Sequence, residues 1–287
     1  MFTPARIAAL SVVAVALIAY AVAQPSLTPP AGPIEQSGRF GARIELSQQT
    51  APGNARAIFR ITQPGSYYLT SDIDSGTRIA VMIASDNVTL DLNGYTISGR
   101  FGNGIQPERD ITEDVVFENL VVRNGRITGY DTGISNDSFS GGFLSEIDRI
   151  VVEDLVITDV ETGIRARNGR IARCVIEATG FGINASFCVI EGCNVNMVDV
   201  GQTGSVIGID AVFCSTNGCF VNTNDAPTAG ATVIGYSIVG GSINASTAIG
   251  RGVGFNGSNK GVATNCVSNN SAPDVFDPDY QTFNCNF

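Results

Sequence analysis

Two stretches of the chain align without a gap and share both Gly and both Cys: GINASFCVIEGCNV (residues 182–195) and GIDAVFCSTNGCFV (residues 208–221). The shift of 26 residues between them carries Cys188 onto Cys214. A recurring pattern with fixed internal spacing is the mark of a solenoid, in which each coil buries its apolar face by stacking on its neighbour. The sequence therefore predicts that Cys188 lies directly over Cys214 in the next coil.

The second half of this motif recurs more loosely as a six-residue pattern: apolar, any two residues, apolar or Cys, any one residue, apolar. Its copies begin at Leu92, Phe117, Val152, Ile171, Ile190, Thr216, Ile238 and Ala263. A Gly precedes seven of the copies, at Gly104, Gly133, Gly163, Gly182, Gly208, Gly230 and Gly254. From Gly163 onward this Gly lies eight or nine residues before the pattern begins. The assignment of Gly230 has a rival, in which residues 233–236 (VIGY) match residues 206–209 (VIGI).

The repeated segments are short, rich in Val and Ile, and separated by Gly, Asn, Asp and Ser, which is the chemistry of strands and turns. Coils of about 19–26 residues built from short strands predict an all-β, single-domain parallel β-helix of about eight coils over residues 76–270. The ends of such a stack need cover. Residues 34–75 are predicted to form an N-terminal cap, and residues 271–287, which include Tyr280, Phe283 and Phe287, a C-terminal cap.

Two further segments carry a resemblance to a known family: ITQPGSYYLT (residues 61–70) and NVTLDLNGYTISG (residues 87–99). They resemble the opening of secreted bacterial right-handed parallel β-helix proteins of the pectin-lyase-like superfamily. The resemblance covers most of the chain after residue 55 and implies the fold and its right-handed sense. It implies little about activity, because many members have no assigned activity.

The N-terminus predicts export. Arg6 precedes an apolar run over residues 7–22, and residues 21–23 (AVA) offer a cleavage site, as in a secretory signal peptide over residues 1–23. The alternative is an uncleaved anchor, but the run is shorter than the roughly 20 residues that span a bilayer. Residues 24–33 (QPSLTPPAGP) are predicted to form a Pro-rich tether. We expect a secreted, cell-surface or periplasmic protein without a membrane span after cleavage.

The charge balance narrows the choice of partners. The net charge is −10, and Lys260 is the only Lys. Because so acidic a chain does not attract phosphate backbones, nucleic acid is excluded as a partner, and polysaccharides or other cell-surface components are favoured.

Seven Cys in an exported chain raise the question of disulfides. The repeat places Cys174, Cys193 and Cys219 in one ladder. Stacked positions bring Cα atoms to about 5 Å, within the range that a disulfide tolerates. The candidate pairs are Cys188 with Cys214 and Cys193 with Cys219, and the alternative is that Cys serves as a small apolar residue in an inner turn.

The chain contains no His, which excludes Ser-His-Asp and Cys-His catalysis and leaves carboxylate and Arg chemistry. Two residues before the repeat Gly come Asp131 and Glu161, and two residues after it comes Arg165. Strand side chains alternate faces, so the pattern predicts that Asp131 stacks on Glu161 on the outer face, with Arg165 beside them. This is the candidate catalytic set, and its alternative is a solvated face whose Arg offsets the carboxylates.

Two coils carry insertions between the Gly and the six-residue pattern, because this interval is 13 residues after Gly104 and 19 after Gly133, against eight or nine elsewhere. Both are predicted to leave one corner of adjacent coils as acidic loops. The candidate ligand-binding residues are Glu108, Asp110 and Asp114 in the first insertion, with Asn184 and Asp210 in the outer row. Such carboxylates suit a hard cation, so Ca²⁺ is the cofactor to consider, and the alternative is a pair of solvated loops.

Two functional hypotheses follow. The first is a polysaccharide-interacting or structural module that presents a long polar face. The second is a polysaccharide lyase or glycoside hydrolase acting on acidic polysaccharide through Asp131, Glu161 and Arg165. The resemblance implies the lyase chemistry, in which Ca²⁺ and carboxylates neutralise a uronate and an Arg takes the adjacent proton. The two carboxylates also suit the acid and base of glycoside hydrolysis. The Gly-His-Gly of polygalacturonases and the Trp-Ile-Asp-His of pectate lyases are absent from the sequence.

Overall fold

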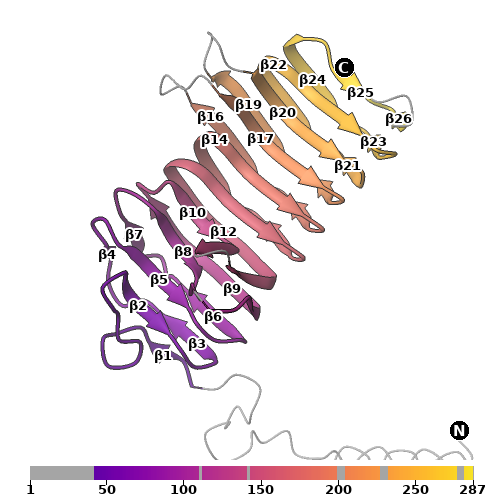
Figure 1. Ribbon diagram of the computed structural model, residues 1–287. Helices are drawn as coiled ribbons and strands as arrows, with labels where there is room; N and C mark the ends of the chain where they lie inside the picture. The colour runs from indigo at the N-terminus through magenta and orange to yellow at the C-terminus, as the bar shows by residue number, and fades with distance from the viewer. Residues whose placement is uncertain are drawn as a thin grey trace, which may run out of the picture. The chain divides into compact units, whose positions relative to one another are not determined.

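The computed structural model describes residues 42–109, 112–140, 143–198, 204–226, 232–276 and 281–286. Within these ranges all the regular secondary structure is β-strand (Figure 1). The predicted signal peptide and tether lie outside the described residues, as do Asp110, Gly230, Tyr280 and Phe287. The described part therefore tests the repeat and most of the candidate site.

The strands form three rows, and within each row they pair in parallel. The first row is β2 (Ala57–Ile61), β5 (Ile79–Ile83), β8 (Asn103–Pro107), β10 (Thr132–Ser135), β12 (Phe143–Arg167), β14 (Val175–Ser186), β17 (Ser205–Val212), β20 (Thr232–Val239), β22 (Thr247–Ser258) and β25 (Val275–Phe276).

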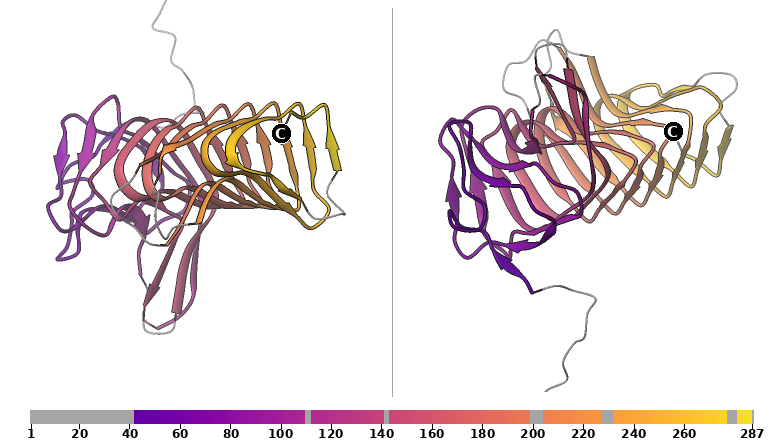
Figure 2. Two further views of the ribbon diagram at one scale, coloured as in Figure 1. Left: turned by 90° about the horizontal axis from the view of Figure 1, so that it is seen from above. Right: turned by 60° about the horizontal axis from the view of Figure 1, so that its bottom comes forward.

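The second row runs from β1 (Ile44–Glu45) through β3 (Gly65–Tyr68), β6 (Val88–Asp91), β9 (Val115–Thr128), β12, β13 (Arg170–Ala172), β15 (Val189–Glu191), β18 (Ser215–Asn217), β21 (Ser242–Asn244) and β23 (Val262–Thr264) to β26 (Gln281–Phe283). The third row is β4 (Ile73–Asp74), β7 (Thr96–Ser98), β9, β12, β14, β16 (Asn194–Val198), β19 (Phe220–Asp225), β22 and β24 (Val267–Ala272). The chain thus passes through the three rows in turn, and each pass, here called a coil, lies against the next (Figures 1 and 2).

Two corners of each coil have a fixed geometry. The first corner, between the first and second rows, holds a left-handed residue in every described coil from residue 87 onward: Asn87, Asn119, Arg149, Asn168, Phe187, Phe213, Gly240 and Asn259. The second corner lies five residues later in the coils from Asn119 to Gly240 and six residues later in the coil of Asn259, and it holds Asn124, Asp154, Arg173, Gly192, Gly218, Ala245 and Asn265. Asn and Gly dominate these columns because they adopt positive φ at least cost.

The repeat Gly forms an inner column that requires the absence of a side chain. A Cβ at Gly182 would lie 2.5 Å from the carbonyl oxygen of Gly208, and one at Gly208 would lie 2.7 Å from that of Gly235. Beside it, the side chains of successive coils stack in one buried column: Ile105, Ile134, Ile164, Ile183, Ile209, Tyr236 and Phe255. The core is therefore a set of ladders, each made by one position of the repeat.

The register confirms the rival assignment near residue 230. Ile207 pairs with Ile234 and Ile209 with Tyr236, so the repeat Gly of this coil is Gly235 and not Gly230. The copy predicted at Ile238 moves by the same five residues, because Thr216 pairs with Ile243. The copy predicted at Phe117 also moves by five residues, since the partner of Val152 is Val122.

Both predicted caps differ from the structure. Residues 57–75 already follow the three rows, because β2, β3 and β4 pair with β5, β6 and β7. At the other end β24, β25 and β26 continue the rows. Phe283 was predicted to cover the last coil, but its side chain is 55% exposed. The parallel stack is thus longer at both ends than the sequence pattern indicates.

The two insertions leave the first-row side of adjacent coils. In the second insertion β11 (Asp137–Ser140) pairs antiparallel with the start of β12, and this hairpin projects from the stack (Figure 2). The first insertion returns beside it, where Val115 of β9 pairs in parallel with Ser145 of β12. The predicted common corner is confirmed, with a hairpin in place of one of the loops.

Candidate functional site

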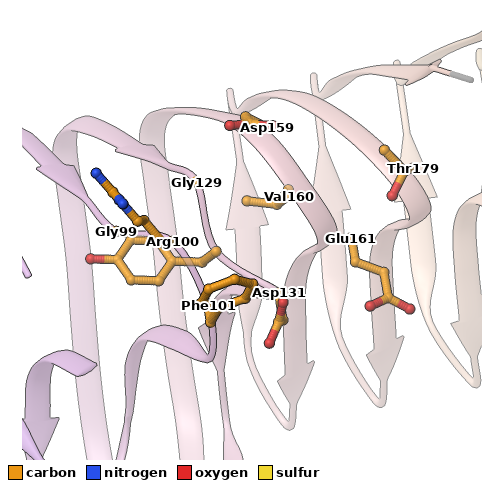
Figure 3. A pocket seen from close by; sticks show the side chains of 10 residues that line it. Gly99, Arg100, Phe101, Gly129, Asp131, Asp159, Val160, Glu161 and Thr179 are labelled. Carbon is orange, nitrogen blue, oxygen red and sulfur yellow. The ribbon is translucent and has the colours of Figure 1, made fainter. Parts of the chain in front are cut away.

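Asp131 and Glu161 lie in adjacent coils, as the repeat predicts, and line one groove. The groove measures about 380 Å³ and is lined by residues 99–101, 129–131, 159–161 and 179. Both carboxylates are exposed and point to the same side of adjacent coils (Figure 3). The two residues are in neighbouring coils, because the backbone nitrogen of Thr162 donates to the carbonyl oxygen of Asp131 at 2.8 Å.

Local contacts fix the position of each carboxylate. The Asp131 Oδ2 atom accepts a hydrogen bond of 2.7 Å from the backbone nitrogen of Gly102, which ties the groove to the preceding coil. Glu161 has room because the next coil offers Gly180 at this point, where a Cβ would come within 3.2 Å of the Glu161 Cγ atom. The groove therefore stays open along the face of several coils.

Tyr130 closes the groove from the inside. Its ring is 3% exposed, and its hydroxyl lies 2.7 Å from the Ser75 Oγ atom and donates to the carbonyl oxygen of Ser98 at 2.9 Å. Burial raises the pKa of Tyr130 to about 12, against a smaller opposing effect of the hydrogen bond with Ser75. Tyr130 is therefore a neutral hydrogen-bonded wall, and not a base, at ordinary pH.

Phe101 and Arg100 complete the lip, and the sequence pattern did not identify either of them. The Phe101 side chain is 62% exposed and lies beside Asp131 (Figure 3). Both residues precede the repeat Gly by more than two positions, outside the rows that the pattern defines. The sequence around them carries no acidic residue, and the proximity of Phe101 to Asp131 arises only from the stacking of coils.

Arg165 does not join the carboxylates, contrary to the prediction. Its guanidinium pairs with the Asp137 Oδ1 atom at 3.5 Å, at the base of the hairpin. Arg165 lies on the same strand as Glu161 and four residues further on, which is about 13 Å of extended chain. The repeat pattern placed residues two before and two after the repeat Gly side by side. In the structure these positions are separated along the strand, so the Arg165 side chain does not reach the carboxylates.

The predicted ligand-binding residues are engaged with the protein itself. Both Glu108 carboxylate oxygens accept hydrogen bonds from Arg60, at 2.7 and 2.6 Å. The Asp114 Oδ1 atom accepts a bond of 2.7 Å from the backbone nitrogen of Leu144. These two acidic side chains therefore hold the insertions in place.

Asn184 and Asp210 stack in the outer first row, as predicted. The Asn184 side-chain nitrogen donates to the Asp210 Oδ2 atom at 3.4 Å. Burial raises the pKa of Asp210, and a hydrogen bond with Ser237 opposes this effect. Among the described residues, no group of three or more His, Cys, Asp or Glu side chains is placed to hold a metal ion.

The cysteines stack as predicted but form no disulfides. The second-corner column contains Cys174, Cys193, Cys219, Ser246, Cys266 and Cys285, and the first-corner column contains Cys188 and Cys214. All seven are free thiols, including the candidate pairs Cys188–Cys214 and Cys193–Cys219. In-register strands hold equivalent Cβ atoms near the strand spacing of about 4.8 Å, whereas a disulfide needs about 3.8 Å.

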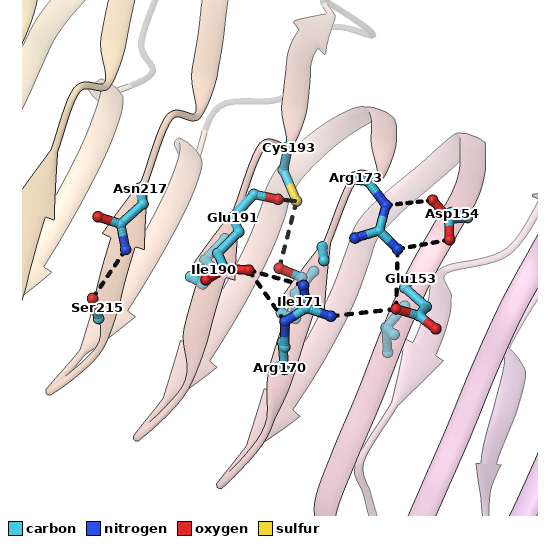
Figure 4. Close-up of polar contacts among 12 residues, drawn as sticks. Glu153, Asp154, Arg170, Ile171, Arg173, Ile190, Glu191, Cys193, Ser215 and Asn217 are labelled. Carbon is cyan, nitrogen blue, oxygen red and sulfur yellow. Dashed lines mark hydrogen bonds and ion pairs between the residues drawn. The ribbon is translucent and has the colours of Figure 1, made fainter. Parts of the chain in front are cut away.

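The side chains on the outer surface of the second row change along the stack, from charged to uncharged. Around β12 and β13, Arg170 bridges Glu153 and Glu191, and Arg173 binds Glu153 and Asp154 (Figure 4). The hydrogen bond from Arg173 lowers the pKa of Asp154. Beyond these coils the same row carries the amide of Asn217, which donates to the Ser215 hydroxyl at 3.1 Å. The second row thus changes from ion pairs to amides and hydroxyls.

Comparisons with known proteins give no family assignment. No family model matches the chain, and no curated protein matches its sequence. No helix in the described ranges is long and apolar enough to cross a bilayer.

Proposed function

We propose that this protein is a secreted or cell-surface right-handed parallel β-helix of the pectin-lyase-like type, and that it binds polysaccharide in the groove of Asp131 and Glu161. One observation carries the proposal. Two exposed carboxylates from consecutive coils share an open groove with an exposed aromatic ring, Phe101. Carboxylate oxygens accept hydrogen bonds from sugar hydroxyls, and an apolar ring packs against the C–H face of a sugar.

The charges of the groove favour uncharged sugars over uronates. Asp131, Asp159 and Glu161 face the same space, and Arg100 is the basic residue that lines it. A uronate would meet three like charges there, in a protein whose net charge is already −10. Binding through hydroxyl groups has no such repulsion.

A second candidate function is glycoside hydrolysis by the same two carboxylates. Consecutive coils lie one strand spacing apart, about 4.8 Å. Retaining glycosidases hold their carboxyl groups about 5–5.5 Å apart. Lyase chemistry has less support, because the Arg that would take the proton, Arg165, is paired with Asp137 at a distance from the groove.

Retention of the full chain, purified after export, on immobilised polysaccharides tests the proposal. We expect binding to at least one uncharged polysaccharide in a panel of cellulose, xylan, mannan, laminarin and dextran. The variant D131N/E161Q and the variant F101A should each lose most of this binding, and R165Q should retain it. Equal binding by wild type and D131N/E161Q would place the site elsewhere.

Product analysis separates binding from turnover. If the hydrolase is correct, wild type shortens the bound polysaccharide, and either D131N or E161Q alone abolishes the products. If the binding module is correct, the polysaccharide is retained without shortened or unsaturated products, with or without Ca²⁺.

A further inference from the structure

Two exposed phenylalanines occupy left-handed backbone positions at the first corner. Phe187 has φ 55° and Phe213 has φ 53°, and their side chains are 53% and 52% exposed. Their rings stack with centroids 5.5 Å apart and an interplanar angle of 17°. In the other described coils from residue 87 onward this corner carries Asn, Gly or Arg. The pair is therefore an exception within its own column.

Neither the backbone nor the solvent favours Phe at this corner. Left-handed φ is an outlier for a bulky residue, whereas Asn and Gly adopt it readily. Leaving half of an aromatic side chain in water also forgoes about half of its hydrophobic stabilisation. Strained residues that the fold does not need are a sign of function.

The neighbouring coil makes room for the Phe213 ring. The next residue of the column is Gly240, where a Cβ would come within 2.7 Å of the Phe213 Cδ1 and Cε1 atoms. Any other residue at position 240 would crowd this ring. On the other side of the pair, Asn168 directs its amide to the Asp148 Oδ1 atom at 2.6 Å, towards the preceding coil.

The adjoining second row is lined by hydroxyls and amides. Ser215 and Ser242 lie in contact through their hydroxyls at 3.4 Å, and Asn217 stacks on Asn244. Between Arg173 and Arg251 the sequence contains no basic residue, and its last Glu is Glu191. An apolar edge thus borders rows of uncharged donors and acceptors along the direction of stacking.

We propose that the Phe187–Phe213 edge is a second contact surface for an uncharged polysaccharide, whose sugar rings pack on the phenylalanines while their hydroxyls bind the Ser and Asn rows. This inference rests on the proposed function but uses a different side of the coils. A second copy of the chain is a poorer fit, because two Phe side chains bury at most about 500 Å² and a specific protein interface buries at least about 1,200 Å².

The variant F187N/F213N tests this surface with opposite effects on stability and binding. Asn is the residue of the same corner at Asn87, Asn119, Asn168 and Asn259. We expect the melting temperature to rise by about 2–4 °C, since the backbone strain is relieved. Retention on the uncharged polysaccharide that wild type binds should fall by about tenfold or more, as for other aromatic anchors. A fall in melting temperature would show that the pair serves the fold, and would overturn the proposal.

Controls separate this inference from the proposed function. R149N makes the same kind of change in the same column and should leave binding intact. If wild type binds no uncharged polysaccharide, the proposed function fails and this inference fails with it. If D131N/E161Q loses binding and F187N/F213N keeps it, this inference alone is overturned. Sedimentation that shows a wild-type dimer, lost only in F187N/F213N, would identify a second copy as the occupant and also overturn it.

Discussion

The hydroxyl oxygen of Ser246 accepts a hydrogen bond from the backbone nitrogen of Cys219 at 3.3 Å, as the Cys285 sulfur does from the backbone nitrogen of Cys266 at 3.5 Å in the same column. Ser246 also donates to the carbonyl oxygen two residues earlier, at 3.0 Å, and Cys219 makes the equivalent contact at 3.5 Å. The second-corner column therefore accepts a small side chain with a weak donor. Ser246 is fully buried, so its hydroxyl brings a polar group into the core.

We predict that S246C is neutral or stabilising. The thiol keeps the contact to the carbonyl oxygen of Asn244, and sulfur is more easily buried than a hydroxyl. The change in the free energy of unfolding should be between zero and a gain of about 1 kcal/mol, measured by denaturant titration. A loss above about 1 kcal/mol would mean that the hydroxyl is required.

We predict that one thiol of seven reacts in the native protein. Cys285 is partly exposed, and the other six cysteines are buried, each at 3% exposure or less. A thiol-specific chromophore should therefore label Cys285 rapidly, and C285S should remove the rapid phase. All seven thiols should react after denaturation without reductant. Fewer than seven would reveal disulfides in the purified protein.

We predict that G182A destabilises the protein strongly. The new Cβ would lie 2.5 Å from the Gly208 carbonyl oxygen and even closer to Val195, so two coils must separate. Overpacking of this kind costs about 3 kcal/mol or prevents folding. The matched control is G204A, which has no atom within 4 Å of its new Cβ and should change stability by less than about 0.5 kcal/mol. Similar melting temperatures for the two variants would contradict the stacked register.

We predict that Tyr130 contributes to loss of stability in alkali. Its folded-state pKa is about 12, above the ordinary value of 10.0. The neutral phenol is therefore favoured by folding, and its contribution is complete below pH 10 and is lost as pH rises towards 12. The loss amounts to about 1.4 kcal/mol per pH unit and about 2–3 kcal/mol in total.

Y130F isolates this contribution. At pH 7 the variant should be less stable than wild type, because it lacks the hydrogen bonds to Ser75 and Ser98. Denaturant titrations at several pH values should show this difference shrinking above pH 10. A difference that stays constant to pH 11.5 would mean that Tyr130 titrates as an ordinary exposed phenol.

The sequence predicted the stacking of coils, the cysteine columns and the placement of Asp131 beside Glu161 in adjacent coils, because all three depend on the repeat length alone. The three five-residue errors have one cause. The six-residue pattern occurs twice in most coils, once at each corner, and the corners of these coils are five residues apart. Residues 185–190 and 190–195 both fit it and share Ile190. The copies at Phe117 and Ile238 belong to the first corner, and the others to the second.

Other features were beyond the pattern because they depend on geometry within one coil. The distance from Glu161 to Arg165 follows from the direction of one strand, which a stacking rule does not contain. The antiparallel hairpin of β11 lies inside an insertion without repeat character. The left-handed φ of Phe187 and Phe213 could not be predicted from the sequence, because bulky residues such as Phe rarely adopt positive φ.

The inner glycine column also makes the chain modular. Gly182 and Gly208 begin consecutive coils, each of which touches chiefly the coils on either side. A duplicate of residues 182–207 inserted after position 207 would meet, on both sides, surfaces for which its own sequence is already adapted. Such an elongated protein should fold as one cooperative unit and display a longer aromatic edge, with three phenylalanines in line where the natural chain has two.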